Sequence, residues 1–213
     1  MKIDEKFNSI SHFLGAVFSL IGGIFLIKYA YSTGDTWKIS GSIIYIITLL
    51  TVLSASTVYH GVSGSKKKIF QILDRISIFY LIAGTYTPFL FVIDHPLRWA
   101  VLGWVWGLAV FGTVFILVFK EKYDLLATLL YLFAGWTIMV DIKGFYTIFP
   151  MEGFYWVVSG GILYTIGAVF YSLDNKLKYN HEIWHIFVLL ASFCFFISVY
   201  NYVIPYTALT AVK

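Results

Sequence analysis

The chain has 213 residues, of which 60% are hydrophobic, 20% are aromatic and only 12% are charged, and its net charge is +4. A soluble domain carries about 25% charged residues, so this chain has too few polar side chains to cover a water-facing surface. The composition excludes a soluble enzyme, a nucleic-acid-binding domain, a disordered regulator and a secreted disulfide scaffold. The single cysteine, Cys194, excludes an intrachain disulfide and a thiolate metal site.

Seven runs of residues are long and apolar enough to cross a bilayer core of about 30 Å, which takes about 20 helical residues. In chain order they are Phe13–Ser32, Ile39–Val62, Ile69–Ile93, Leu97–Phe119, Leu125–Ile142, Phe154–Leu173 and Ile183–Pro205. Their continuity favours helices over the alternating strands of a barrel, and the short linkers leave no room for an extramembrane domain. We therefore expect an all-α integral membrane protein with seven transmembrane helices in a single domain, residues 1–213. In the fourth run, Gly103 and Gly107 fit a close helix contact.

The distribution of Lys and Arg predicts how the chain is oriented in the membrane. The side that holds the N-terminus carries ten of them: Lys2, Lys6, Lys66, Lys67, Lys68, Arg75, Lys120, Lys122, Lys176 and Lys178. The other side carries five: Lys28, Lys38, Arg98, Lys143 and Lys213. Because cytoplasmic loops are enriched in basic residues, we expect a cytoplasmic N-terminus and an external C-terminus.

Ionisable side chains within membrane spans are costly and mark candidate functional positions. Ser56 and His60 are four residues apart near the end of the second span, so they share one helix face. Asp74 lies about one and a half turns into the third span. His181 and His185, again four apart, begin the seventh span. The predicted topology brings all five side chains to the cytoplasmic face at similar depth.

Three neutral imidazoles with one open position are the usual ligand set of a catalytic zinc site. We therefore predict one Zn²⁺ ion bound by His60, His181 and His185. Asp74 is the candidate base, and Ser56 is placed to bond the water, a ligand or the substrate carbonyl. Glu5, Asn8 and His12, at the start of the first span, are candidates for a second shell or lid over this site. His95, beside Pro96, is expected in a loop at the opposite face.

Other interpretations fit some of the same residues. The histidines are also compatible with a structural zinc site or with positions at the membrane interface. Asp74 could form an ion pair with Arg75 or cap the third helix. The hydroxyl of Ser56 could donate a hydrogen bond to a carbonyl of its own helix. The stretch HEIWH also matches the zincin pattern, in which Glu182 would be the general base of an intramembrane metalloprotease. That interpretation gives Ser56 and Asp74 no role.

The sequence resembles the bacterial hemolysin III family, within the progestin and adipoQ receptor superfamily. The matching residues are Glu5, Asn8 and His12 at spacings of three and four, Ser56 with His60, Asp74, the stretch GTYTPF from Gly84 to Phe89, and His181 with His185. The resemblance runs from the first span to the seventh. It implies seven helices in the bacterial plasma (inner) membrane, with a cytoplasmic-side zinc and with Ser56 and Asp74 around it. It also implies a metal-dependent hydrolase of lipid amides such as ceramide.

These observations lead to one main hypothesis and three alternatives. The main hypothesis is a zinc-dependent integral membrane hydrolase that acts on a lipid amide or ester bond, with membrane lipids as its substrates and no nucleic-acid partner. The second is a regulatory or hemolysin-like membrane protein with a structural zinc. The third is a lytic pore, and the fourth is the metalloprotease described above. A pore would need a charged track across the membrane, whereas the ionisable groups here gather at one face.

Overall fold

The computed structural model of the protein describes residues 3–173 and 179–207, and within these residues all regular secondary structure is helical. The elements are α1 (Ile3–Ser32), α2 (Thr36–Gly61), α3 (Lys66–Val92), α4 (Arg98–Phe119), α5 (Asp124–Gly135), the 3₁₀ helix η1 (Trp136–Asp141), α6 (Ile142–Ile148), α7 (Met151–Ser172), α8 (Asn180–Ser198) and the π-helix η2 (Val199–Val203). Seven helical stretches in this part of the chain are long and apolar enough to cross a membrane, as the sequence predicts.

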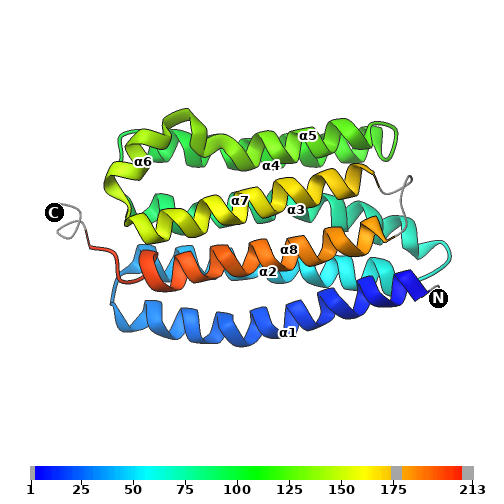
Figure 1. The fold of residues 1–213 in the computed structure, drawn as a ribbon, viewed down its shortest axis with the longest axis horizontal. Helices are drawn as coiled ribbons and strands as arrows, with labels where there is room; N and C mark the ends of the chain where they lie inside the picture. Colours follow the sequence, from blue (N-terminus) through cyan, green and yellow to red (C-terminus); the bar gives the residue numbers. More distant parts are fainter. Residues whose placement is uncertain (1–2, 174–178, 208–213) are drawn as a thin grey trace.

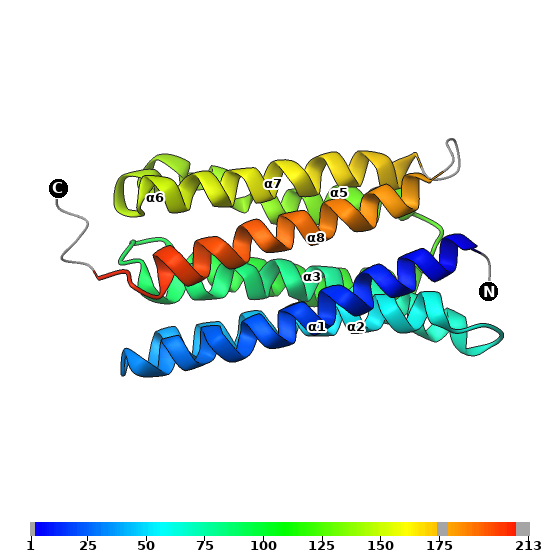
Figure 2. The same ribbon diagram turned by 60° about the horizontal axis from the view of Figure 1, so that its bottom comes forward.

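The spans run up and down along one bundle axis, so that α1 begins at the end of the bundle opposite to η2 (Figure 1). Helix α1 packs on α2, α2 on α3, α3 on α4, and α7 on α8 (Figure 2). The end of the bundle where α1 begins, α2 ends and α8 begins is called the N-terminal end below. Its cytoplasmic orientation stays a prediction. Four of the lysines on which that prediction depends lie outside the described residues: Lys2, Lys176, Lys178 and Lys213.

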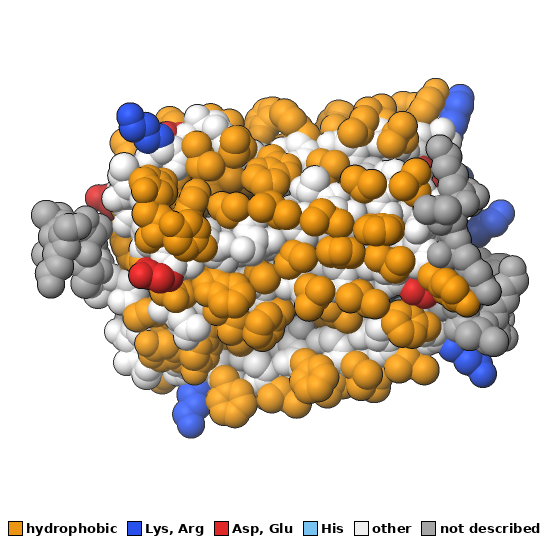
Figure 3. Space-filling model, viewed as in Figure 1, with side chains coloured by type: hydrophobic (Ala, Val, Ile, Leu, Met, Phe, Trp, Pro, Cys, Tyr) orange, Lys and Arg blue, Asp and Glu red, His pale blue; other side chains and the backbone are white. Residues whose placement is uncertain are grey.

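Large apolar side chains cover the face of the bundle drawn in Figure 3, while the charged side chains on that face lie near its two ends. Phe18 and Val140, for example, are 70% and 73% exposed. Apolar patches of this extent are rare on soluble monomers and identify a surface that faces lipid. The chain is therefore a multi-pass integral membrane protein.

Close packing between α2 and α3 is possible because Gly84 has no side chain. A Cβ at this position would lie 2.0 Å from Oγ1 and 2.8 Å from Cβ of Thr48 on α2. The contact expected at Gly103 and Gly107 is wrong, because a Cβ at either position would meet no described atom within 4 Å. That face of α4 points away from the neighbouring helices.

The fifth span is broken and extends further than the sequence predicts. We expected it to end at Ile142, but after α5 it continues through η1 and α6 to Ile148. Asp141 restarts the helix by accepting a hydrogen bond from the backbone N–H of Gly144 at 2.9 Å. At the break, the hydroxyl of Tyr86 donates to Gly135 O at 2.6 Å and accepts from the backbone N–H of Ile138 at 2.9 Å. Irregular backbone at membrane depth is tolerated where such groups satisfy it.

The loop between α2 and α3 turns tightly at the N-terminal end. Gly64 has φ of +75°, a backbone conformation that favours glycine, and its carbonyl accepts the N–H of Lys67 at 3.2 Å. This turn brings the first residues of α3 back beside the last turn of α2.

Candidate metal centre

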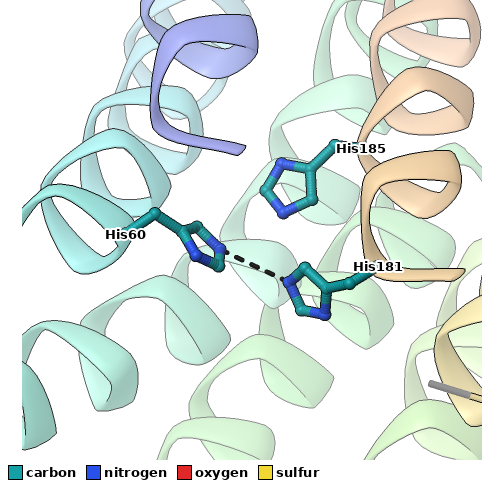
Figure 4. Close-up of side chains that lie close together, drawn as sticks. All are labelled: His60, His181 and His185. Carbon is teal, nitrogen blue, oxygen red and sulfur yellow. Dashed lines mark hydrogen bonds between the residues drawn. The ribbon is translucent and has the colours of Figure 1, made fainter. Parts of the chain in front are cut away.

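Three histidines from two helices meet at the N-terminal end of the bundle (Figure 4). His60 comes from the last turn of α2, whereas His181 and His185 come from successive turns of α8. Their nearest ligand atoms all lie within 4.8 Å of one another, and His60 Nε2 is 3.4 Å from His181 Nε2. Within the described part of the chain, this is the one group of metal-ligating side chains close enough to share an ion. The expected meeting of the three imidazoles is confirmed.

The surroundings of these imidazoles fit a metal ion. His60 and His185 are 3% and 1% exposed. Nδ1 of His185 has no hydrogen-bond partner among the described residues. A buried polar atom without a partner is costly, and each such atom in a native structure calls for an explanation. Imidazole nitrogens prefer zinc, copper, iron or nickel to magnesium or calcium, so the donor set fits a transition metal such as zinc.

Glu5 on α1 contacts this cluster directly. Its Oε2 lies 2.8 Å from His60 Nδ1, and its Oε1 accepts a hydrogen bond from Lys67 Nζ at 2.7 Å. An ionised carboxylate can only accept, so the proton on His60 is at Nδ1 and the lone pair is at Nε2. Nε2 is the atom that faces His181. Carboxylate partners of this kind fix the ring orientation of metal-ligating histidines.

Asn8 and His12 lie deeper along α1 and are each 3% exposed. The ring centroids of His12 and His185 are 3.9 Å apart. Neither ring nitrogen of His12 has a hydrogen-bond partner in the described chain, nor does Oδ1 of Asn8. Glu5 and His12 of the first helix therefore contact the cluster, whereas for Asn8 the structure shows burial on the same helix.

Ser56 and Asp74 lie beside the histidines. Ser56 is 2% exposed, and it lines the same cavity as Asp74, His181 and His185. Arg75, by contrast, is turned away: it pairs with Asp124 and donates to Lys120 O at 2.8 Å. The alternative ion pair between Asp74 and Arg75 is therefore wrong in this structure.

A cavity of about 220 Å³ begins at this site and runs along the bundle. Its N-terminal end is lined by His12, Ser56, Asp74, His181 and His185. Asp74 and Ile93 both line it, and their separation along α3 corresponds to about 28 Å at 1.5 Å per residue. Most of the wall between them is apolar, including Leu81, Phe89, Val157 and Phe195.

The opposite end of the cavity is lined by polar residues whose contact with one another the sequence did not predict. His95 lies in the loop between α3 and α4, as expected, but its Nε2 pairs with Asp141 at 2.9 Å. Its Nδ1 accepts the backbone N–H of Leu97 at 3.2 Å. Both His95 and Asp141 line the cavity, as does Arg98. The two partners are 46 residues apart, one in the α3–α4 loop and one at the junction of η1 and α6, and no sequence pattern connects them.

Glu182, the base that a zincin would require, is not among the side chains that line the cavity. It follows His181 directly, and neighbouring residues on a helix point about 100° apart. Asp74 therefore shares the cavity with His181 and His185, whereas Glu182 does not.

The sequence matches known proteins over nearly its whole length. A family model described as "Haemolysin-III related" matches residues 2–196. Hemolysin-3 of Bacillus cereus is 39% identical over 204 residues, which cover 95% of this chain and 93% of that protein. The Hemolysin-3 homolog of Bacillus subtilis (strain 168) is 37% identical over 201 residues, with 93% and 94% covered. Monocyte to macrophage differentiation factor of Homo sapiens is 27% identical over 202 residues, with 92% and 82% covered. Since the family model and the bacterial relatives span nearly the whole chain, this protein belongs to the haemolysin III family.

Proposed function

We propose that this protein is a zinc-dependent membrane hydrolase that cleaves an amide or ester bond of a lipid at the cytoplasmic face. The observation that carries the proposal is the shared cavity. One end of it holds His181, His185, Ser56 and Asp74, and the rest of its wall is largely apolar. Ligand sites are typically concave and mostly apolar, with a few convergent polar groups, and this cavity has that form.

His60, His181 and His185 would hold the zinc ion. When bound, zinc supplies a Lewis acid that polarises a carbonyl oxygen and activates water. The carboxylate of Asp74 would take the proton released when water attacks the carbonyl, and would return it to the departing nitrogen or oxygen. The hydroxyl of Ser56 would hold that carboxylate in place by donating a hydrogen bond to it.

The apolar part of the cavity would bind the hydrocarbon chain of the lipid. Burial of the chain would place the scissile bond at the polar end, beside the histidines. Leu81, Phe89 and Val157 would exclude water from the chain. This accounts for a site within the membrane boundary rather than in a soluble domain.

The direct test measures lipid hydrolysis by purified protein on a panel of lipid amides and esters. We expect turnover that chelator abolishes and that added Zn²⁺ restores. Asp74→Asn should lower kcat roughly 10²- to 10⁴-fold, the usual contribution of a positioned acid–base group, while zinc content is retained. Glu182→Gln is the matched carboxylate control and should keep the activity.

Other results would favour the other interpretations. Loss of activity in Glu182→Gln, together with cleavage of membrane peptides, would favour the protease. Zinc binding that raises thermal stability without turnover on any lipid would favour a structural site. Leakage of liposomes that depends on protein dose but not on zinc would favour a pore.

A further inference from the structure

Lys67, in the first turn of α3, is linked to the histidine cluster through one carboxylate. Its Nζ lies 2.7 Å from Glu5 Oε1, and the other oxygen of that carboxylate, Oε2, lies 2.8 Å from His60 Nδ1. The three side chains come from α3, α1 and α2. A single bridging carboxylate therefore joins a lysine of α3 to a candidate metal ligand.

Lys67 differs from the two lysines beside it. Lys66 and Lys68 are exposed, whereas the side chain of Lys67 is only 30% exposed. Its ammonium lies 4.9 Å from the ring centroid of Tyr59, whose ring is in turn 4.5 Å from that of His60. The three lysines contribute equally to the basic loop that predicts orientation, but Lys67 alone has these contacts among the interactions described.

A cation in the first turn of a helix is unfavourable, because the N-terminal end of the helix dipole is positive. The contact with Glu5 offsets this cost for Lys67. In return, the ammonium donates a hydrogen bond to one oxygen of the carboxylate and holds it in place. The other oxygen is then directed at His60, which keeps the proton on Nδ1 and the lone pair on Nε2.

We propose that Lys67 is a positioning residue for the candidate metal centre: it fixes Glu5, and Glu5 orients His60 for zinc. This inference rests on the metal site of the proposed function. It goes beyond that site by giving one lysine at the start of α3 a role in metal binding, in addition to its contribution to membrane orientation.

The contact between Lys67 and Glu5 could stabilise the fold or the bound metal, and the two effects differ in size. An ion pair exposed to this extent adds little to folding, since solvent screens it. Loss of an outer-shell partner of a metal-ligating histidine, in contrast, typically weakens metal binding 10- to 100-fold. Metal affinity is therefore the measurement that distinguishes a positioning role from an ion pair that only holds α1 and α3 together.

The experiment measures the Zn²⁺ dissociation constant of the full-length protein in detergent, by competition with a coloured chelator after metal removal. For Glu5→Gln we expect zinc binding weakened about 10- to 100-fold, and for Lys67→Met about tenfold. Lys67→Arg should restore binding, since it keeps the charge and a donor. Lys66→Met and Lys68→Met remove the same charge from the same loop and should bind zinc as the wild type does.

A double substitution tests whether Lys67 acts through Glu5. In the Glu5→Gln background, Lys67→Met should weaken zinc binding no further. Additive losses would overturn the proposal, as would equal losses in Lys66→Met and Lys67→Met, or unchanged affinity in Lys67→Met. Absence of zinc binding by the wild type would instead contradict the proposed function, so the two failures are distinguishable.

Discussion

His60 and His181 are 121 positions apart in the sequence, yet their Nε2 atoms lie 3.4 Å apart. The proton of His60 is held at Nδ1 by Glu5, so its Nε2 presents a lone pair to the second imidazole. A proton on His181 or a shared cation makes this approach favourable. His185 adds a third imidazole whose Nδ1 has no partner in the described chain. The three imidazoles could therefore hold one metal ion between them.

The first prediction is that purified protein binds one zinc ion, and that His60→Ala loses it. Removal of zinc from the wild type should lower Tm by roughly 5–10 °C, because a metal present at 100 times its Kd adds about 2.7 kcal/mol of stability. Elemental analysis and a thermal melt measure both effects. His95→Ala is the control, since His95 lies at the opposite end of the cavity. Equal loss of zinc in the two variants would contradict the assigned site.

The second prediction concerns the length of the cavity. Leu90 lines it far from the histidines and is 8% exposed. Leu90→Trp should fill this far end and lower kcat/KM for long-chain lipids roughly 10- to 200-fold, the range that contacts of about one methylene control in apolar pockets. Short-chain lipids should be cleaved as before. Leu190→Trp, at an exposed position outside the cavity, should leave kcat/KM unchanged for both long-chain and short-chain lipids. An equal loss for long and short chains would contradict this arrangement of the substrate.

Much of the candidate site could be predicted from the sequence because helix geometry is regular. Ser56 with His60, and His181 with His185, are four residues apart, and this spacing fixes a shared face. Once alternating spans are assumed, the end of the second span and the start of the seventh span must lie at the same membrane face. The positions of Glu5, Asn8 and His12 near the same end follow from the same assumption.

The contacts that the sequence could not predict depend on side-chain placement between helices. Lys67 is one of three consecutive lysines, and only the direction of its side chain distinguishes it from Lys66. The pairing of His95 with Asp141 joins the α3–α4 loop to the end of η1, and the break in the fifth span depends on a hydroxyl from α3. Gly103 and Gly107 show the converse, because their spacing suits a helix contact that α4 does not make.

The third prediction uses two glycines that have opposite surroundings. At Gly84, a Cβ would lie 2.8 Å from Cβ of Thr48, a backbone-attached atom that a rotamer change cannot move away. Gly84→Ala should therefore destabilise the fold by about 1–3 kcal/mol, the usual cost of overpacking. At Gly103, a Cβ would meet nothing within 4 Å, so Gly103→Ala should be neutral or stabilise by about 0.5–1 kcal/mol. Unfolding in detergent mixtures measures both, and comparable stability of the two variants would contradict the close α2–α3 contact.

The fourth prediction concerns the break in the fifth span. The hydroxyl of Tyr86 satisfies one backbone carbonyl, Gly135 O, and one backbone N–H, that of Ile138. Tyr86→Phe leaves both without this partner, and each unsatisfied group costs about 1–3 kcal/mol, so we expect a stability loss of about 2 kcal/mol or more. The loss should be local, with faster amide hydrogen exchange over η1 and α6 than over α2 and α3.

Tyr155→Phe is the matched control for this substitution, because Tyr155 on α7 is 60% exposed and the hydrogen bonds to Gly135 O and Ile138 N–H come from Tyr86 instead. It should leave both stability and exchange unchanged. If Tyr86→Phe behaves in the same way, the backbone at Gly135 and Ile138 must find other partners, such as water in the adjacent cavity. If exchange rises uniformly over the described helices, Tyr86 stabilises the whole bundle, and the prediction of a local effect at η1 and α6 is wrong.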